Sequence, residues 1–543
     1  MEQPRFALRG RIVTMNTRHK VLEDGVLYVN AGVIDAVRPA GDPPPQGYEN
    51  TRLTDSGGTV YPGLIELHNH LPYDVLQLWQ VPQRYSNRSQ WGGSRNPDYR
   101  RLVTGPMTVL GEDPDLMPAV VRYVEAKALV NGTTTSQGIA LFSNMGARRM
   151  YRGVVRNVEQ TDDAALPEAA SRIADVEAAD ARRFLTRLQQ PHRLLLHLAE
   201  GTDAAARAHF QALEFEPGKW AITDNLVGIH CTGLTGADFG ILAGHGGSMV
   251  WSPLSNLLLY GQTADIAAAK RTGMLIGLGS DWSISGSKGL LGELKAARLA
   301  SAAAGGVFSD RDLVAMATRD AAAILRWDRA LGTLRAGMRA DLLTVKGTGS
   351  DPYSALVDAK DSDIALVVIA GTARYGIRRL MKRLAPGAPL ENPAGDAPGD
   401  RVLNLSQTTA DPIVAGLTLA EATARLRTAL ADLPDRAGRE ARTAGRGLRA
   451  RADGTPNWYL ALDEIHPTGA ELRPRLPLHA NGGTTRAAPS GPVISTRDTS
   501  SDGLVSLPLD DLTATRDPAF LAALAAEANL PDTYSVQLSR LLA

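Results

Sequence analysis

The sequence predicts an α/β protein in which strands and helices alternate along a parallel sheet. Between residues 57 and 330, short apolar runs alternate with longer segments of helical periodicity, which is typical of repeated strand–helix units. Histidines and one aspartate follow several of these runs, at the points where strands would end. The expected helices are 118–130, 167–189, 263–272 and 309–326, the last with a Ser309-Asp310 cap.

Short β-rich runs flank the strand–helix region on both sides. Before it, residues 10–15 and 26–29 are apolar, β-rich runs separated by turn residues. After it, residues 340–345 and 363–369 have the same character. Both flanks are therefore expected to form sheet.

The amino-acid composition of the sequence changes beyond residue 385. Residues 385–398 are rich in Pro, Ala and Gly, and residues 482–503 are rich in Ser, Thr and Gly, as linkers are. Helical stretches are expected at 417–431 and 518–528. We interpret this tail as a packing or oligomerisation extension, with substrate gating as the alternative.

Two histidines separated by one residue, His68 and His70, close an apolar run that begins at Pro62. In a β-strand, residues i and i+2 point to the same side, so both imidazoles face one site. His197, His230 and Asp281 each follow a later apolar run. Since the carboxyl ends of the strands in a (β/α)8 barrel meet at one mouth, these side chains are expected to converge.

Imidazole nitrogens and a carboxylate oxygen are ligands that suit zinc, with iron and manganese as alternatives. An open coordination position lets such an ion bind water and lower the pKa of that water towards neutrality. Each residue alone has an ordinary structural interpretation, because a lone histidine usually packs and an aspartate after Gly279-Ser280 can form a turn. The ordered set favours one divalent metal ion in a hydrolase.

On these residues the chain resembles the amidohydrolase superfamily, in the branch that contains cytosine, guanine and S-adenosylhomocysteine deaminases and triazine hydrolases. Glu200, three residues after His197, and the Pro-x-Ser-Asn motif at 253–256 match further features of that branch. The resemblance implies a (β/α)8 TIM-like barrel with a small β-sandwich built from both flanks of the barrel, plus a C-terminal extension that it does not explain. The implied units are the N-terminal portion of the β-sandwich at 1–56, the hydrolase barrel at 57–330, the second portion of the β-sandwich at 331–385 and the extension at 386–543.

The resemblance also implies a role for each residue of the set. The implied metal ligands are His68, His70, His197 and Asp281. His230 is expected to hydrogen-bond the metal-bound water and the substrate, and Glu200 to carry a proton from that water to a ring nitrogen of the substrate. Asp281 would also help to deprotonate the water and protonate the leaving amine. One metal is expected, because Lys127 falls in a helical segment and no lysine ends a strand-like run in the right region.

Substrate contacts are expected from the loop after the first metal motif, residues 77–101, and from two later positions. Loops after barrel strands build the substrate pocket, and aromatic side chains there stack on planar rings. An ordinary surface loop with anchoring tryptophans is the alternative. The candidates are Trp79, Tyr85, Arg88, Asn256 and Trp282.

Glu200 after His197 favours hydrolytic deamination of an aminated heterocycle such as a purine, pyrimidine, pterin or triazine. The alternative is hydrolysis of a cyclic or acyclic amide carbon–nitrogen bond, since the same activated water attacks a carbonyl. A non-catalytic binding protein on a decayed barrel is the third hypothesis, although decay usually removes the ligands first and all of them are present here.

The composition narrows the class of partner. Lys+Arg and Asp+Glu number 58 each, so the chain offers no electrostatic case for nucleic acid or an acidic membrane. The single cysteine excludes an intramolecular disulfide framework. The sequence has neither a signal-like start nor a bilayer-length apolar run. We expect a cytoplasmic enzyme with a small-molecule substrate, and the family resemblance is compatible with a homodimer or larger assembly without indicating which.

Overall fold

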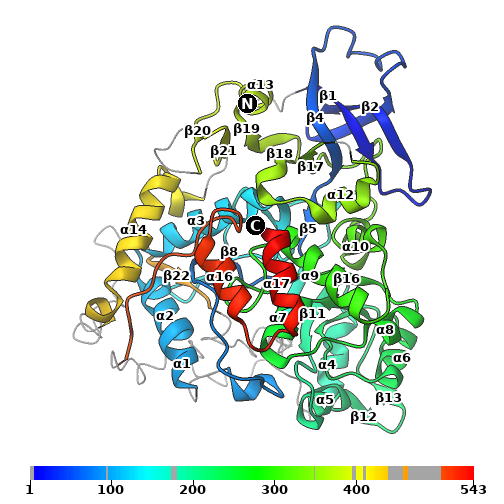
Figure 1. Ribbon diagram of the computed structural model, residues 1–543. Coiled ribbons are helices and arrows are strands. Elements are labelled where there is room, and N and C mark those ends of the chain that lie inside the picture. The colour runs from blue at the N-terminus through cyan, green and yellow to red at the C-terminus, as the bar shows by residue number, and fades with distance from the viewer. Residues whose placement is uncertain are drawn as a thin grey trace, which may run out of the picture.

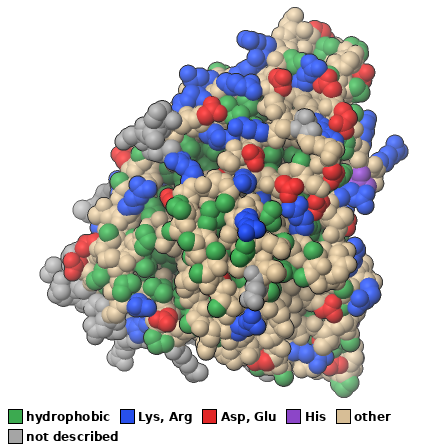
Figure 2. Space-filling model, in the orientation of Figure 1, with side chains coloured by type: hydrophobic (Ala, Val, Ile, Leu, Met, Phe, Trp, Pro, Cys, Tyr) green, Lys and Arg blue, Asp and Glu red, His purple; other side chains and the backbone are tan. Residues whose placement is uncertain are grey.

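A computed structural model of the chain describes residues 5–92, 96–172, 180–347, 349–393, 399–407, 411–437, 456–462 and 503–543. Figure 1 shows a sheet-rich end, built from the N-terminal strands and from strands of the middle of the chain, beside a larger body covered by helices. The surface in Figure 2 carries basic and acidic side chains interspersed, in line with the balanced composition. Among the described residues, no helix is long and apolar enough to cross a membrane.

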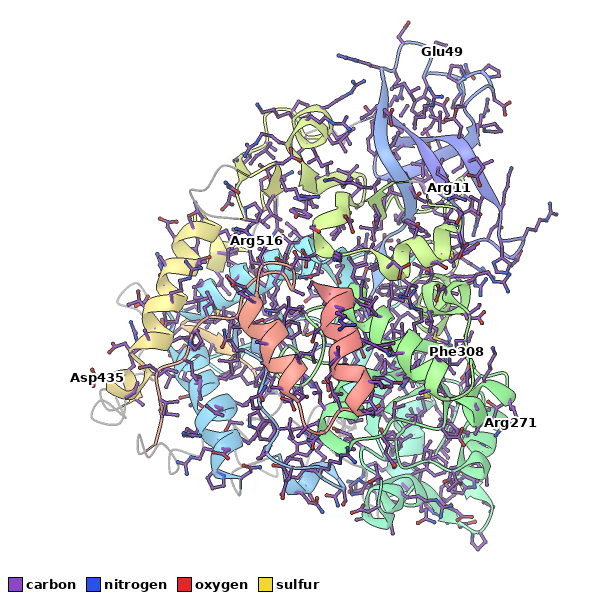
Figure 3. All side chains as sticks on the ribbon, viewed as in Figure 1. Arg11, Glu49, Arg271, Phe308, Asp435 and Arg516 are labelled. Carbon is purple, nitrogen blue, oxygen red and sulfur yellow. The ribbon has the colours of Figure 1, made fainter. Side chains whose placement is uncertain are left out.

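The sheet-rich end is one mixed nine-stranded sheet, in the order β20-β21-β19-β18-β17-β4-β1-β2-β3. β4 joins the two flanks, because it pairs in parallel with β1 and antiparallel with β17. Arg11 of β1, which is labelled in Figure 3, adds a side-chain link by donating to the carbonyl oxygen of Ser350 at 3.1 Å. The strands are β1 Phe6–Val13, β2 Val21–Asn30, β3 Val33–Pro39, β4 Leu53–Pro62, β17 Leu342–Lys346, β18 Ile364–Ile369, β19 Thr372–Ile377, β20 Leu390–Glu391 and β21 Arg401–Asn404.

The apolar runs predicted at 340–345 and 363–369 are confirmed as β17 and β18. β18 is buried along its whole length, and its β-branched residues suit a strand covered on both faces. The two flanks thus share one sheet. That this sheet belongs to a two-layered sandwich stays a prediction, as do the unit boundaries at 56, 330 and 385.

Parallel strands form the centre of the larger body. One parallel group has the order β5-β6-β9 and another the order β10-β11-β14-β15-β16. β14 and β15 are buried at every position, as parallel strands between helices are. The bounds are β5 Leu64–Ile65, β6 Thr133–Ser136, β9 Arg156–Asn157, β10 Ala169–Arg172, β11 Arg193–Leu198, β14 Leu226–His230, β15 Ser248–Trp251 and β16 Ile276–Leu278.

Backbone hydrogen bonds connect the two parallel groups at both of their outer edges. The N–H of Ala169 donates to the carbonyl oxygen of Val158 at 2.8 Å, which links the β9 side to β10. The N–H of Leu67 donates to the carbonyl oxygen of Leu278 at 3.1 Å, which links the β5 side to β16. The end of the first strand therefore lies beside the end of the last one.

Helices and short hairpins complete the body. The longest described helices, α3 and α9, pack their apolar faces into the main core. The helices in and around the body are α1 Pro97–Tyr99, α2 Gly105–Glu112, α3 Met117–Val130, α4 Ala181–Leu188, α5 Ala204–Gln211, α6 Gly236–Gly244, α7 Pro253–Tyr260, α8 Ile266–Arg271, α9 Leu290–Ala303, α10 Asp310–Met316, α11 Arg319–Ile324, α12 Pro352–Asp358 and α13 Arg378–Leu384. The small strands are β7 Ala140–Ser143, β8 Arg148–Met150, β12 Glu214–Glu216 and β13 Lys219–Trp220.

Two of the helix predictions are wrong in some of their residues. The segment predicted as a helix at 167–189 begins instead with strand β10, because pairing with β11 overrides the helical propensity of the alanines in this strand. Helix α4 covers only the C-terminal part of the segment. Residues 173–179 lie outside the residues that the structure describes. The helix predicted at 309–326 is divided into α10 and α11, because Thr318 is not helical and the carbonyl of Ala317 accepts from the N–H of Ile65 at 2.8 Å. The other two, 118–130 and 263–272, are confirmed as α3 and the shorter α8.

The tail packs on the body rather than standing apart. α14 Leu419–Ala431 lies against α3, and β22 Trp458–Leu460 pairs with β7. α16 Pro518–Ala526 and α17 Asp532–Leu542 contact each other and share a hydrophobic cluster with α7 and α9 (Figure 1). The helices predicted at 417–431 and 518–528 are thus confirmed, while residues 394–398 and 482–502 of the predicted linkers lie outside the described residues.

Asp341 holds the sheet-rich end to the body, which makes its removal a test of this arrangement. Its buried carboxylate pairs with Arg156 of β9 at 3.2 Å and accepts from the N–H of Ala370 at 2.7 Å. Asp341→Ala leaves both partners unsatisfied, so we expect the free energy of unfolding to fall by about 3 kcal/mol. Asp224→Ala, which removes an exposed pair with Arg326, is the matched control and should cost less than about 1 kcal/mol. Equal losses in urea denaturation would contradict this role for Asp341.

Candidate metal centre

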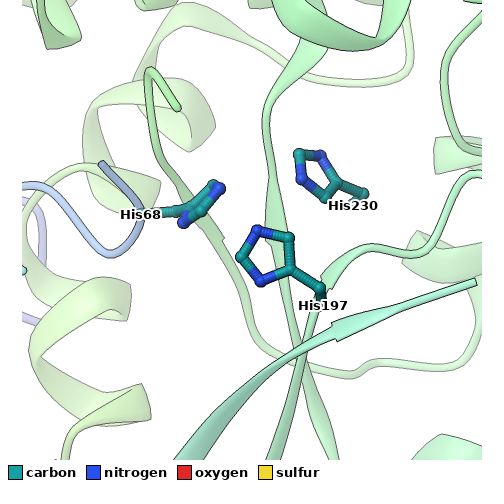
Figure 4. A group of neighbouring side chains, drawn as sticks. All are labelled: His68, His197 and His230. Carbon is teal, nitrogen blue, oxygen red and sulfur yellow. The ribbon is translucent and has the colours of Figure 1, made fainter. Parts of the chain in front are cut away.

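The structure brings the five predicted metal-site side chains together at the ends of the parallel strands. His68 and His70 follow β5, His197 lies in β11, His230 ends β14, and Asp281 follows β16. All five are buried. Figure 4 shows the imidazoles of His68, His197 and His230 directed into the same space from three separate segments.

Local backbone geometry fixes where two of these side chains point. The N–H of Asp281 donates to the carbonyl oxygen of His68 at 3.1 Å, and the N–H of His70 donates to that of Asp281 at 2.6 Å. His230 and Asp281 both have left-handed φ values, 65° and 69°. Such values are costly for residues other than glycine and collect at functional sites, where surrounding structure enforces them.

The candidate ligand atoms fall into two overlapping groups that share His68. One group is His68, His197 and His230, and the other is His68, His70 and Asp281; within each group the ligand atoms lie within 4.8 Å of one another. Nε2 of His68 is 3.0 Å and Nε2 of His70 is 3.4 Å from Oδ1 of Asp281. The His68 and His197 ring centroids are 4.7 Å apart.

A borderline divalent ion fits this donor set. Imidazole and carboxylate ligands bind zinc at about 2.0–2.2 Å, so atoms around one ion lie about 3–4 Å apart, close to the spacing seen here. Burial also favours the neutral form of the His197 imidazole, and ligation requires a neutral imidazole. Burial is the largest cause lowering the pKa of His197 well below its ordinary value, and the neighbouring histidines lower that pKa further.

Hydrogen bonds determine which nitrogen of His68 faces the site. Oε1 of Gln137 accepts from the N–H of Asn69 at 3.0 Å, so this atom is the amide oxygen and an acceptor. It lies 2.9 Å from Nδ1 of His68, which must therefore carry the proton. Nε2 of His68 is left with its lone pair towards the site, the arrangement that partners of a ligating histidine usually impose.

His230 is held in the opposite tautomer by a chain of three side chains. The indole N–H of Trp251 donates to Oγ1 of Thr263 at 2.7 Å, and that hydroxyl donates to Oδ1 of Asn256 at 3.2 Å. The amide nitrogen of Asn256 therefore donates to Nδ1 of His230, at 3.0 Å. Nε2 of neutral His230 then carries a proton directed towards the site. This agrees with a hydrogen-bonding rather than a ligating role.

Asp281 presents one oxygen to the histidines because the other is occupied. Oγ of Ser255, at the start of α7, donates to Oδ2 of Asp281 at 2.5 Å. Oδ1 is the atom that faces His68 and His70. Burial by itself raises the pKa of Asp281, but the interactions of its carboxylate with His68, His230 and His70 lower that pKa well below its ordinary range. Asp281 is thus a carboxylate near neutral pH.

Glu200 lies at the edge of the metal cluster and contacts three polar side chains. The hydroxyl of Tyr260 donates to Oε1 of Glu200 at 2.8 Å, while Nε of Arg88 lies 3.6 Å and Nε2 of His230 lies 3.9 Å from Oε2. The indole N–H of Trp91 donates in turn to the Tyr260 oxygen at 2.9 Å. A carboxylate so placed can exchange protons with a group bound between it and His230.

The five candidate substrate residues occupy different positions. Arg88 contacts Glu200, Asn256 contacts His230, and the Trp282 ring centroid is 5.1 Å from that of His70, so these three border the site. Trp79 and Tyr85 instead stack on each other with centroids 6.3 Å apart, and the Tyr85 oxygen accepts from Asn96.

Sequence reasoning missed two residues that hold the site, Gln137 and Tyr260, and it gave Trp91 no role of its own within the expected substrate loop 77–101. Tyr260 had a usable signal, because it stands four residues after Asn256 and so shares a face of the same helix. Gln137 had only its place after the Thr133–Ser136 run as a signal. Trp91 stood among the aromatic residues of the loop 77–101, but nothing in the sequence indicated its hydrogen bond with Tyr260. Lys127 lies on α3 and donates to Asp74 and Asp510, away from the cluster, as a single-metal site requires.

Comparison with known proteins identifies the family. The model of the amidohydrolase family matches residues 194–374, which include His197, His230 and Asp281. The 5-methylthioadenosine/S-adenosylhomocysteine deaminase of Symbiobacterium thermophilum is 23% identical over 422 residues, covering 67% of this chain and 92% of that protein. Residues 194–374 therefore belong to the amidohydrolase family.

Solved amidohydrolase structures share the fold. The zinc-bound adenosine deaminase of Xanthomonas campestris aligns with a TM-score of 0.51 at 18% identity, over 78% of this chain and 98% of that one. The atrazine chlorohydrolase of Arthrobacter aurescens TC1, complexed with zinc, aligns with a TM-score of 0.53 at 20% identity, over 78% and 100%. The body of this amidohydrolase therefore has a TIM-barrel-like α/β fold.

Burial of neutral histidines makes the stability of the metal-free protein depend on pH. Burial is the main cause lowering the pKa of His230 to about 3, whereas an unfolded histidine titrates near its ordinary value of 6.5. Between those values the unfolded chain binds more protons, so the free energy of unfolding falls as the pH falls, by up to about 1.4 kcal/mol per unit for each such histidine.

We therefore expect the urea midpoint of chelator-treated protein to fall between pH 6.5 and 5. His230→Asn should flatten the slope, whereas His192→Asn, at an exposed histidine, should leave it unchanged. A wild-type midpoint that rises on acidification would contradict the burial of neutral imidazoles.

Proposed function

We propose that this amidohydrolase is a metal-dependent deaminase that hydrolyses the exocyclic amino group of a nitrogen heterocycle. The observation that carries the proposal is the position of Glu200, an acid/base side chain beside a buried cluster of histidines and an aspartate. The relatives named as 5-methylthioadenosine/S-adenosylhomocysteine deaminases support the same reaction class. The enzyme acts on a carbon–nitrogen bond other than a peptide bond, and its substrate is a small molecule.

One divalent ion, zinc, is the cofactor that this site fits best. We assign His68, His70, His197 and Asp281 as its ligands, supported by the two overlapping groups of ligand atoms. When bound, zinc in such a site lowers the pKa of a coordinated water towards neutrality and so supplies a nucleophile.

The side chains around the metal site transfer the protons of the reaction. Glu200 accepts a proton from the attacking water and delivers it to a ring nitrogen, so the ring carbon becomes tetrahedral. Nε2 of His230 donates a hydrogen bond to the oxygen that has been added. The carboxylate of Asp281 takes the remaining proton and passes it to the amino group, which leaves as ammonia while the carbon–oxygen double bond forms.

Tyr260 and Asn256 act by holding other side chains. Tyr260 donates to one oxygen of Glu200, so the second oxygen stays directed towards His230. Asn256 fixes the tautomer in which His230 is a donor towards the site. Arg88 and Trp282 border the same space, and we retain them as substrate contacts. Trp79 and Tyr85 are kept as more remote candidates, since they contact each other.

We further infer that the eight strands β5, β6, β9, β10, β11, β14, β15 and β16 close into a (β/α)8 barrel. The two backbone hydrogen bonds at the outer edges of the parallel groups support closure, as does the meeting of all five metal-site residues at one end. The β-sandwich, a cytoplasmic location and a homo-oligomeric state stay predictions.

Glu200→Gln tests the acid/base role. The amide retains the shape of the side chain but cannot accept the proton, so we expect kcat to fall by about 10²–10⁴-fold while one zinc ion per chain is retained. Glu168→Gln, at an exposed glutamate, is the matched control and should keep wild-type turnover. Retained activity in Glu200→Gln would exclude Glu200 as the acid/base.

Ammonia release by zinc-loaded protein tests the reaction class. A panel of aminopurines, aminopyrimidines, pterins and amino-triazines should contain at least one substrate that releases one ammonia per turnover. Zinc-loaded protein that releases none across the panel, yet cleaves amides, would contradict deamination and favour amide hydrolysis.

A further inference from the structure

The C-terminal segment supplies two carboxylates to a buried cluster of charges that also contains two lysines of the body. Asp510 pairs with Lys127 of α3 through one oxygen and with Lys288 at 2.7 Å through the other. Asp517 pairs with Lys288 at 2.8 Å. Each of these four side chains is at most 3% exposed. We call these four residues the charge cluster; it joins the tail to two distant segments of the body.

The charge cluster is connected to two of the segments that carry candidate metal ligands. Nζ of Lys127 donates to the carbonyl oxygen of Asp74 at 2.7 Å, within the short helix η1 Leu71–Val75 that directly follows His70. The side chain of Asp74 accepts from the N–H of Ser283 at 2.7 Å, two residues after Asp281. Lys288 lies further along the same segment as Ser283. The tail is therefore connected by hydrogen bonds to both segments that hold His70 and Asp281.

Electrostatics make Asp510 the residue on which the charge cluster depends. Burial is the largest cause lowering the pKa of Lys127, and Asp510 is the strongest influence that raises it again. Asp510 is likewise the strongest influence that raises the pKa of Lys288 against burial. Removing this carboxylate leaves Lys127 a buried cation whose remaining acidic neighbour is Asp74, and such a charge pulls in water or moves its neighbours.

A second set of tail contacts reaches the elements that hold Glu200 and His230. The amide of Asn529 donates to the carbonyl oxygens of Leu258, in α7, at 2.7 Å and of Gln83 at 3.2 Å. The backbone oxygen of Asn529 accepts from Arg84 at 3.1 Å, and that of Ala523 accepts from Gln80 at 3.0 Å. In Figures 1 and 3 helix α16, which begins just beyond the labelled Arg516, and helix α17 lie across the front of the body.

We propose that Asp510 is a positioning residue for the metal centre, and that residues 510–529 of the tail are a working component of the catalytic body rather than an added domain. The inference rests on the proposed function, because it takes His70 and Asp281 to be metal ligands. Through Lys127 and Asp74, Asp510 fixes the distance between the η1 segment and the 281–288 segment. If that distance changes, His70 and Asp281 no longer fit one ion as well, and the affinity of the site for zinc falls.

The test compares zinc affinity, by chelator competition on the full chain, in Asp510→Asn and in the neighbouring variant Asp511→Asn. Asp511 meets Lys288 through its backbone oxygen, so its side chain is the matched control. We expect Asp510→Asn to bind zinc at least tenfold more weakly and to change the visible absorption spectrum of the cobalt-substituted protein, while Asp511→Asn stays within twofold of wild type.

A double variant separates positioning from folding. Lys127→Met with Asp510→Asn removes one positive and one negative charge together, and leaves Lys288 paired with Asp517. Replacing a buried pair in this way is often neutral for stability. The double variant should therefore unfold near the wild-type temperature by circular dichroism, but still bind zinc at least tenfold more weakly, since the bond from Lys127 to Asp74 is gone.

The outcomes distinguish the two proposals. Wild-type zinc affinity and cobalt spectrum in the double variant would overturn the positioning role of Asp510, whether or not Asp510→Asn folds. Wild-type protein that holds no stoichiometric zinc or cobalt would instead overturn the proposed function. Weakened zinc binding in the double variant, with wild-type thermal unfolding, would support the role.

Discussion

The junction between the ends of the first and the last parallel strands is the constraint on which the rest of the site depends. Two backbone hydrogen bonds hold Asp281 between His68 and His70, and they set the left-handed backbone of Asp281 that turns its carboxylate towards the imidazoles. Residues separated by more than two hundred positions thus become a single ligand set. Strain at Asp281 and His230 is tolerated because buried hydrogen bonds on both sides determine those conformations.

Hydrogen bonds from neighbouring side chains fix the tautomer of two imidazoles of the cluster, His68 and His230. Gln137 accepts from Nδ1 of His68, so Nε2 of His68 presents a lone pair to the site. Asn256 instead donates to Nδ1 of His230, so Nε2 of His230 presents a proton to the site. Ser255 occupies one oxygen of Asp281, and Tyr260 occupies one oxygen of Glu200. Two residues of the same type, His68 and His230, therefore serve different purposes: one presents a lone pair and the other presents a proton.

The features of the site that depend on short-range pattern could be predicted from the sequence. His-x-His on a strand, the later His and Asp after apolar runs, and Glu200 three residues beyond His197 are all local signals, and the structure brings these residues together. The misplaced helix at 167–189 shows the limit of such signals, since strand pairing of β10 with β11 is a long-range contact. The contacts of Gln137, Trp91 and Asp510 could not be predicted for the same reason, because their partners are distant in the chain. In the tail, composition indicated linkers only at 385–398 and 482–503. Asp510 and Asn529 lie outside those ranges and contact the catalytic body through single side chains, which no sequence periodicity predicts.

The most direct test of the central claim is the number of zinc ions held per chain, measured by mass spectrometry of metals after extensive dialysis, with Asp281→Asn alongside. Histidines at the end of one strand and an aspartate at the end of another should together hold one ion. We predict one zinc per wild-type chain and a large loss of zinc in Asp281→Asn. Two ions per chain, none, or a full complement in Asp281→Asn would contradict this claim.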